Sequence, residues 1–309
     1  MSGPALWDGP IVDAHQHFWD PTVNHHPWLT PEAAIPFRYG DYSAIKRPYL
    51  PDDYRADAAA HNVVQTVYVE TEWDPADPIG ETRYATGLAA RHGLPNAIVA
   101  QAWLDRADAA DVLAAQAAFP LVRSVRHKPG GPATPAELGT RATLMSDPAW
   151  RRGYAVLGRH RLHFDLQTPW WNLPEAVRLA GDFPDTLIIL NHAGLPGGRD
   201  PAALDGWRQA MAALAACPNV VVKVSGMGEP GVAWTAERNA PVVRFIIDTF
   251  GAERAMFGSN FPVDSLCARF DEIVVGVQRI MAAYPRAAQA AFFAETAQRV
   301  YRIASPPRA

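Results

Sequence analysis

The strongest constraint on the fold of this 309-residue chain is a short apolar run that recurs eight times between helical segments. Most of these runs are rich in β-branched residues and almost continuously hydrophobic, which is typical of parallel strands that are covered on both faces. The first predicted strand begins near Ile11. The other seven cover residues 63–69, 97–100, 121–126, 162–166, 186–190, 220–224 and 254–257.

A helical pattern follows each predicted strand. The predicted helices cover residues 51–61, 80–92, 108–119, 147–157, 174–181, 201–216, a segment around 243–250, 270–280 and 286–303. Eight strand–helix units over about 300 residues favour a closed (β/α)8 TIM barrel over an open, doubly wound sheet. No linker interrupts the pattern, so the sequence predicts one α/β domain over residues 10–304.

The composition of the chain excludes several classes of protein. Hydrophobic residues make up 49% of the sequence and charged residues 19%, which indicates a large core. The net charge of -4 and the lack of a basic tail argue against a nucleic-acid partner. Two cysteines, no signal-peptide pattern and no apolar run of about 20 residues favour a cytoplasmic protein without a membrane segment. We expect a small-molecule substrate; a homo-oligomer is compatible with the sequence.

Two histidines separated by one residue follow the start of the first strand, in the run Val12–His17. Because side chains alternate between the faces of a strand, His15 and His17 point the same way. Two imidazoles on one wall can bind a cation or a polar substrate. Asp13 has the same parity, and we expect it to accept a hydrogen bond from the first histidine. The alternative is a pair of ordinary loop histidines.

Residues 18–50 show no regular period and combine several prolines with several aromatic residues. A loop of this length inside a compact domain is uncommon unless it has a function. Prolines prevent regular structure here, while the aromatic side chains require burial. We therefore interpret residues 18–50 as a lid or pocket wall beside the histidines, with surface padding as the alternative.

Polar residues gather at the carboxyl ends of the predicted strands, where the active sites of such barrels lie. In chain order they are His15, His17, Glu70, Gln101, Arg126, His127, Lys128, Asp165, Gln167, His192, Ser225, Asn260 and Asp264. The basic cluster on the fourth strand suits an anionic or oxygen-rich substrate. Glu70 is open to interpretation as a base, a ligand or a hydrogen-bond acceptor. Trp171 follows the fifth strand directly and is either a pocket wall or a core residue.

Five short motifs then occur in a defined order. They are residues 12–19 after the first strand, 125–128 at the fourth, 164–167 at the fifth, 190–194 at the sixth and 257–262 at the eighth. With this ordered set the chain resembles the amidohydrolase superfamily, from about residue 10 to about residue 303. The resemblance is to the amidohydrolase-2 branch, which includes 2-pyrone-4,6-dicarboxylate lactonase and sugar lactonases.

The resemblance implies a metal site and a general base. In such families the first-strand histidine pair, histidines from strands five and six and an aspartate after strand eight hold one or two metals. The aspartate also takes the proton of the attacking water. His15, His17 and His192 match three of these positions. Asn260 stands where the family usually has the aspartate, and asparagine cannot act as a general base.

The fifth strand departs from the family pattern as well. It offers Asp165 and Gln167 at its end, while His163 lies farther back. The metal set is therefore incomplete, and we expect that no tightly bound metal is required. The alternative is one divalent ion, preferably zinc, held by His15, His17 and His192.

The resemblance implies a hydrolase, a lactonase that opens a lactone or related cyclic ester by water attack at the carboxyl face of the barrel. His192 and Arg126 would stabilise the oxyanion, with Asp264 or Glu70 as base. The predicted substrate-binding residues are His15, His17, Lys128, Gln167, Trp171 and Asn260. Two alternatives stay open: a metal-dependent decarboxylase of an aromatic or unsaturated acid, and an inactive barrel that binds a metabolite.

Overall fold

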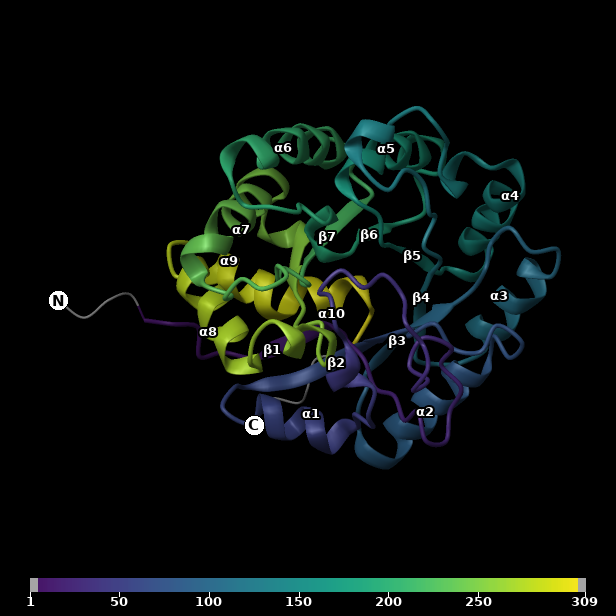
Figure 1. The fold of residues 1–309 in the computed structure, drawn as a ribbon, viewed down its shortest axis with the longest axis horizontal. Helices are drawn as coiled ribbons and strands as arrows, with labels where there is room; N and C mark the ends of the chain where they lie inside the picture. The colour runs from purple at the N-terminus through teal and green to yellow at the C-terminus, as the bar shows by residue number, and fades with distance from the viewer. Residues whose placement is uncertain (1–4, 305–309) are drawn as a thin grey trace.

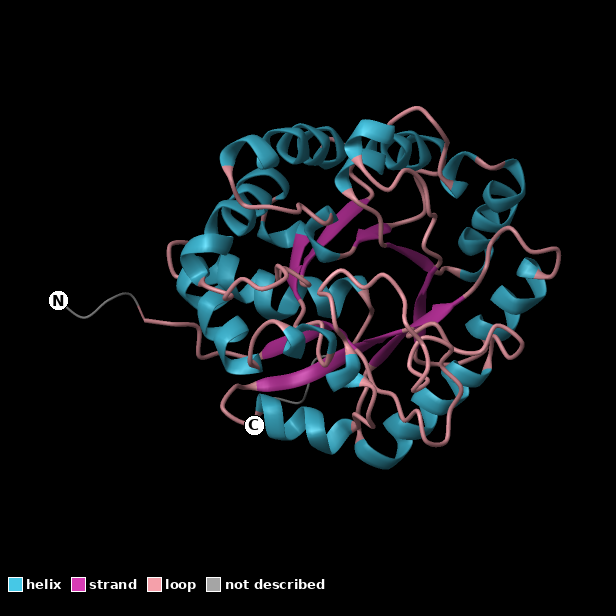
Figure 2. Ribbon diagram, viewed as in Figure 1, coloured by secondary structure: helices cyan, strands magenta, loops and turns pink. Residues whose placement is uncertain are grey.

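The computed structural model describes residues 5–304, which form a barrel of eight parallel strands surrounded by helices (Figures 1 and 2). The predicted (β/α)8 fold is confirmed. The strands are β1 (Ile11–Gln16), β2 (Val63–Val69), β3 (Ala97–Gln101), β4 (Val122–Arg126), β5 (His163–Leu166), β6 (Ile188–Leu190), β7 (Val220–Val224) and β8 (Ala255–Phe257). They pair in chain order from β1 to β8. All of their carboxyl ends therefore lie on one rim.

The helices form the outer layer of the barrel. They are α1 (Pro51–Ala58), α2 (Gly80–His92), α3 (Ala109–Ala117), α4 (Pro148–Val156), α5 (Leu173–Asp182), α6 (Pro201–Ala215), α7 (Ala236–Phe250), α8 (Phe270–Met281), α9 (Arg286–Ala290) and α10 (Thr296–Val300). Local signals set several of their ends: α2 stops at Gly93, whose φ is 74°. The predicted helix over 286–303 is continuous only in part, because a π-helical turn at Ala291–Glu295 separates α9 from α10. Among the described residues, no helix is long and apolar enough to cross a membrane.

A charged network fills part of the barrel interior. The Asp165 carboxylate lies 2.6 Å from the Lys223 ammonium group, and both side chains are fully buried. The same carboxylate accepts hydrogen bonds from the hydroxyl of Tyr301 at 3.1 Å and from Nδ2 of Asn191 at 2.8 Å. A buried ion pair needs such additional partners to offset the cost of desolvation. Asp165, which the strand-end pattern placed at the rim, is therefore an interior residue.

The barrel closes between β8 and β1 through the segment that follows β8. The backbone N–H of Asn260 donates to the carbonyl of His15 at 2.7 Å, and the N–H of His17 donates to the carbonyl of Phe261 at 2.8 Å. Asp13 adds a side-chain link, because its carboxylate accepts from both the N–H and the hydroxyl of Ser259, at 2.8 and 2.5 Å. The two histidines of β1 are thereby held directly beside Asn260.

Asp13 does not hold a histidine ring, so that part of the sequence interpretation is wrong. Besides Ser259, its carboxylate accepts from the Tyr54 hydroxyl at 2.8 Å and from the backbone N–H of His15 at 3.1 Å. The alternation of side chains placed Asp13 and His15 on one face of the strand. It carries no information about Ser259, which follows β8 and donates to Asp13 twice. Burial raises the pKa of the Asp13 carboxyl, and the hydrogen bonds from Ser259 act in the opposite direction.

We predict that Asp13→Ala destabilises the protein by about 3 kcal/mol, because it leaves the buried donors of Ser259 and Tyr54 without an acceptor. Tyr54→Phe removes only one of these hydrogen bonds and should cost about 1 kcal/mol. Urea unfolding followed by circular dichroism measures both variants. A midpoint for Asp13→Ala equal to that of the unchanged protein would contradict a role for this carboxylate in closing the barrel.

Candidate active site

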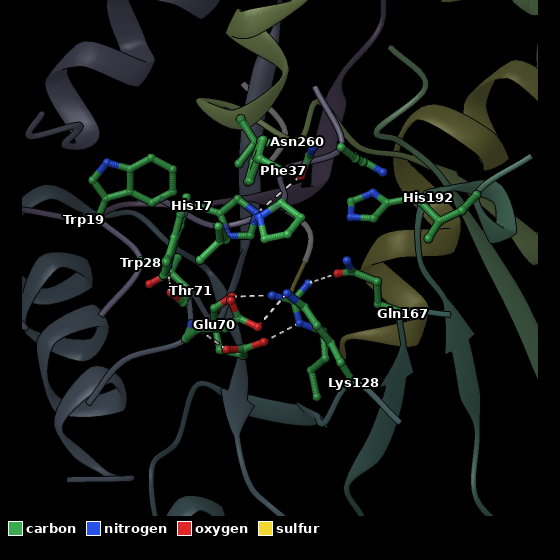
Figure 3. A pocket seen from close by; sticks show the side chains of 17 residues that line it. His17, Trp19, Trp28, Phe37, Glu70, Thr71, Lys128, Gln167, His192 and Asn260 are labelled. Atoms are coloured by element: carbon green, nitrogen blue, oxygen red, sulfur yellow. Dashed lines mark hydrogen bonds and ion pairs between the residues drawn. The ribbon is translucent and has the colours of Figure 1, made fainter. Parts of the chain in front are cut away.

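A cavity of about 290 Å³ opens at the carboxyl ends of the strands. Figure 3 shows the side chains around it. They are His17, Trp19, Trp28, Ile35, Pro36, Phe37, Arg38, Glu70, Thr71, Glu72, Arg126, Lys128, Gln167, His192, Leu195, Asn260 and Val263. Apolar walls with a few convergent polar groups are typical of sites for small molecules.

The loop of residues 18–50 builds one wall of this cavity. Six of its residues line the cavity, from Trp19 to Arg38. The rings of Trp28 and Phe37 stack with centroids 5.9 Å apart. The indole N–H of Trp28 donates to the backbone carbonyl of Thr71 at 2.7 Å, which ties the loop to the end of β2. The wall is thus formed by the chain's own loop, whose aromatic side chains face inward.

Three imidazoles lie together beneath and beside the cavity. The ring of His15 lies between those of His17 and His192, with centroid distances of 5.1 and 4.4 Å. Nδ1 of His17 donates to the carbonyl of Val69 at 2.7 Å, and Nδ1 of His192 lies 3.0 Å from the Ser225 hydroxyl. His17 and His192 line the cavity, whereas His15 is buried behind them and neither of its ring nitrogens has a hydrogen-bond partner among the described residues.

The environment keeps all three imidazoles neutral at neutral pH. Burial, helped by the charge of Arg126, lowers the pKa of His17 to about 3. The pKa values of His15 and His192 are held well below the usual value, again mainly by burial, which penalises the charged form. Since Nδ1 of His17 carries its proton toward Val69, Nε2 of this ring carries a lone pair.

That lone pair faces a second acceptor. Nδ2 of Asn260 donates to Asp264 Oδ1 at 2.6 Å, which orients the amide so that its oxygen lies 3.3 Å from Nε2 of His17. In the neutral ring two acceptors face each other, and this contact becomes a hydrogen bond only when His17 gains a proton. The arrangement therefore suits the protonated imidazole, or a donor placed between the two atoms.

Arg126 and Glu70 form a buried ion pair at the opposite wall. The guanidinium donates through Nε to the Glu70 carboxylate and through Nη1 to the side-chain oxygen of Gln167 at 2.8 Å. The second carboxylate oxygen of Glu70 accepts from the N–H of Glu72 at 2.8 Å. Burial alone would raise the pKa of Glu70, but Arg126 and Lys128 hold it below its ordinary value. Both oxygens of this ionised carboxylate accept hydrogen bonds, so the role of Glu70 is to hold the Arg126 guanidinium in position.

Backbone conformation also marks the site. Glu72, His192 and Asn260 line the cavity with positive φ angles of 56°, 54° and 58°. Non-glycine residues in this region cost about 1–3 kcal/mol each, and they cluster at functional sites. Gly226, with φ at 58°, lies so close that a Cβ on it would overlap Nδ1 of His192 and Nη2 of Arg38. Only glycine leaves both side chains in place there.

Besides His15, two predicted site residues lie outside the cavity lining. Asp264 is buried behind Asn260 and also accepts from the hydroxyl of Tyr39 at 2.9 Å. Burial raises its pKa to about 6, against the opposing charge of Arg38. Trp171 lines a different cavity and donates through its indole N–H to the carbonyl of Pro132 at 2.9 Å. Its predicted contact with the same substrate is therefore not supported by its position.

Several lining residues were not identified from the sequence. Arg38, Thr71 and Leu195 were not singled out, and the loop aromatics were predicted only as a group. One signal was present for Arg38, because a lone cation between Phe37 and Tyr39 is unusual in an aromatic run that must be buried. The predicted residues that do line this cavity are His17, Glu70, Arg126, Lys128, Gln167, His192 and Asn260.

The buried carboxyl of Glu81 binds Thr71, the residue after β2 that Trp28 of the loop contacts. Oε1 of Glu81 in α2 accepts from the Tyr68 hydroxyl at 2.7 Å and from the N–H and hydroxyl of Thr71 at 2.5 and 2.8 Å. Its other oxygen is buried and has no hydrogen-bond partner among the described residues. Burial and the nearby charge of Glu70 raise the pKa of Glu81 to about 7.

Comparisons with known proteins match nearly the whole chain. The family model described as amidohydrolase matches residues 12–303. The uncharacterized protein y4mH of Sinorhizobium fredii is 38% identical and the match covers 96% of this chain and 99% of that protein. L-fucono-1,5-lactonase of Burkholderia ambifaria is 31% identical, with coverage of 84% and 83%. A crystal structure of an amidohydrolase from Burkholderia multivorans with bound zinc has a TM-score of 0.79 at 26% identity, covering 96% and 100%.

We predict that Glu81 makes stability fall as the pH rises from about 4.5 to about 7. Its pKa is higher in the folded than in the unfolded chain, so folding favours the protonated form and this contribution is lost above the folded pKa. Glu81→Gln keeps an acceptor for Thr71 and should be about 2 kcal/mol more stable than the unchanged protein at pH 8, with little difference at pH 5.

Denaturant unfolding at a series of pH values measures this difference. Glu32→Gln, a change at an exposed carboxylate of the loop, serves as the control and should leave the pH dependence unchanged. Parallel stability curves for Glu81→Gln and the unchanged protein over pH 5–8 would show that Glu81 does not titrate in this way.

Proposed function

Because this chain belongs to the amidohydrolase family, we propose that its cavity is the active site of a lactonase, which opens a lactone or related cyclic ester bearing carboxylate or hydroxyl groups. The observation that carries the proposal is the placement of neutral His17 and His192 opposite the Arg126 guanidinium around one cavity. The likeness to a relative named L-fucono-1,5-lactonase supports the same reaction class.

The lactone carbonyl lies between His192 and Arg126 in this mechanism. If the Ser225 hydroxyl donates to Nδ1 of His192, the proton of this neutral ring is on Nε2 and points to the carbonyl oxygen. Arg126 stays positively charged at neutral pH, and Glu70 and Gln167 orient it while using only some of its N–H groups. Donors fixed in advance stabilise the oxyanion of the tetrahedral intermediate more than they stabilise the substrate.

The attacking water lies on the cavity side of His17 and Asn260, within hydrogen-bond distance of both side chains. It donates one proton to Nε2 of His17 and the other to the amide oxygen of Asn260, the two acceptors that face each other at 3.3 Å. As water attacks the carbonyl carbon, Nε2 takes its proton, and the resulting imidazolium donates to Asn260 while Nδ1 keeps its bond to Val69. His17 then returns the proton to the departing ring oxygen, which completes hydrolysis to the hydroxy acid.

This mechanism reassigns the predicted base. Glu70 is fully engaged, and Asp264 lies behind Asn260 without lining the cavity. Asp264 instead positions the Asn260 amide, so that its oxygen accepts from His17 only when His17 is protonated. The site thereby favours the state that follows proton transfer, which offsets the low basicity of a buried imidazole.

The donor groups around this cavity differ from the ligand set that the family usually provides for a metal ion. No group of three or more histidine, cysteine, aspartate or glutamate side chains in residues 5–304 converges in a way that would hold an ion. The unpartnered ring of His15 is the observation in favour of a ligand there. The bond from Nδ1 of His17 to Val69 leaves Nε2 available as a ligand, but Asn260 stands in place of the carboxylate that the family usually supplies. The donors do not fit the group, so no step above passes through a metal.

The decisive experiment combines a lactone panel with elemental analysis. We expect hydrolysis of at least one aldonolactone or carboxylated lactone, at the same rate with and without chelator, and at least a 100-fold loss in His192→Ala. A chelator-sensitive rate with stoichiometric zinc would overturn the metal-independent mechanism. Carbon dioxide release from aromatic acids would point to the decarboxylase instead, and tight metabolite binding without turnover to an inactive barrel.

Asp264 gives this mechanism a pH signature. Burial raises its pKa to about 6, and the ionised carboxylate accepts from Asn260 more strongly than the neutral acid does, so activity should fall as the pH drops below about 6. Asp264→Asn should lower kcat about 100-fold and remove this acidic limb. The pH profile of kcat for both proteins is the measurement. An Asp264→Asn variant with full rate and an unchanged acidic limb would exclude the residue from the mechanism.

A further inference from the structure

We propose that Arg38, carried by the loop of residues 18–50, binds a carboxylate on the substrate and so selects anionic lactones over neutral ones. The inference rests on the proposed lactonase function and names the substrate class of that site. It follows from how the cations around the cavity are paired, how Arg38 is held and what lies beside it.

Three cations line the cavity, and two of them are already paired. Arg126 is bonded to Glu70, and the ammonium group of Lys128 lies 2.7 Å from Glu72. Arg38 differs, because its nearest carboxylate oxygen, on Asp264, is 3.8 Å from Nη2 and beyond hydrogen-bond distance. Within the described part of the chain, this buried Nη2 has no hydrogen-bond partner. Arg38 is therefore the lining cation whose charge no carboxylate of the described residues pairs at hydrogen-bond distance.

Asp264 lies beside Arg38 but makes no hydrogen bond to its guanidinium. The same Oδ1 atom that faces Arg38 accepts from the hydroxyl of Tyr39 and from Nδ2 of Asn260, at 2.9 and 2.6 Å. A substrate carboxylate can bring two oxygens to the guanidinium at hydrogen-bond distance, which Asp264 does not do. Such a group would bind the part of the Arg38 guanidinium that faces the cavity, since this side chain is 29% exposed.

The guanidinium is held in a defined place. It lies over the ring of Tyr39, 4.5 Å from the centroid. On another side is Gly226, where a Cβ would overlap both Nη2 of Arg38 and Nδ1 of His192. Arg38 and His192 are thus neighbours of the same glycine. A carboxylate bound to Arg38 would lie close to the carbonyl that His192 polarises, so we infer that the acid group is attached to or near the lactone ring.

Matched substrates test this inference directly. A panel of five- and six-membered lactones, each as the free carboxylate and as its methyl ester, removes the charge with little change of shape. The unchanged protein should prefer the carboxylate. Arg38→Gln should raise KM for the carboxylate about 30-fold, as expected for a lost charged hydrogen bond, with kcat altered less than about threefold. Its kcat/KM for the methyl ester should fall much less than that for the carboxylate, and the remaining turnover also shows that the variant is folded.

Two further variants serve as controls. Arg47→Gln removes an exposed arginine from the same loop, away from the cavity lining, and should behave as the unchanged protein. Arg38→Lys keeps the charge but loses the paired N–H geometry and should recover part of the preference. An Arg38→Gln variant that keeps the full preference for the carboxylate over the methyl ester would overturn the inference.

A binding measurement separates this inference from the proposed function. Glutarate, a dicarboxylate that cannot be hydrolysed, is titrated calorimetrically into the unchanged protein and into Arg38→Gln. We expect binding that weakens at least tenfold in the variant. Binding that depends on Arg38, together with no lactone turnover, would reject the lactonase and keep Arg38 as a carboxylate receptor. Turnover of neutral lactones, without carboxylate preference or glutarate binding, would keep the lactonase and reject the role of Arg38 as a carboxylate receptor.

Discussion

The carboxylate of Asp13 is the contact on which the rest of the structure depends. It joins β1 to the segment after β8, where the parallel ladder gives way to isolated backbone hydrogen bonds. The same closure sets His17 beside Asn260, the two acceptors that the proposed water contacts. Folding and chemistry therefore share one interaction: the side chain that completes the barrel also sets the geometry of the reacting groups. A buried carboxylate is tolerated here because several donors compensate its desolvation.

Much of the fold was predictable from the sequence because its signals are local. Apolar runs such as 63–69 and stop signals such as Gly93 report on their own neighbourhood, and strand-end placement followed from the barrel itself. That rule located His17, Arg126 and His192 at the cavity. The π-helical turn near the carboxyl terminus, by contrast, depends on packing of residues that are distant in sequence, so helical periodicity alone could not reveal it.

The candidate site was less predictable because ion pairing is a property of three-dimensional structure. Arg126 and Lys128 suggested an anionic substrate by their number, yet each has a glutamate partner about 56 residues away. These ion pairs remove the basis on which charge composition predicted an anionic substrate. Arg38, the cation that we propose for the substrate carboxylate, lies in an irregular loop, whose path is set by contacts such as that of Trp28 with Thr71. No period in the sequence encodes those contacts.

The left-handed backbone at Glu72, His192 and Asn260 has a consequence for evolution and engineering of this barrel. Glycine at any of these positions would relieve conformational strain and increase tolerance to heat, while removing a side chain that faces the cavity. Selection for stability alone would thus tend to erode the site. Variants recovered from a thermal screen should accumulate at these three positions in inactive proteins, whereas active survivors should carry their changes in the outer helices.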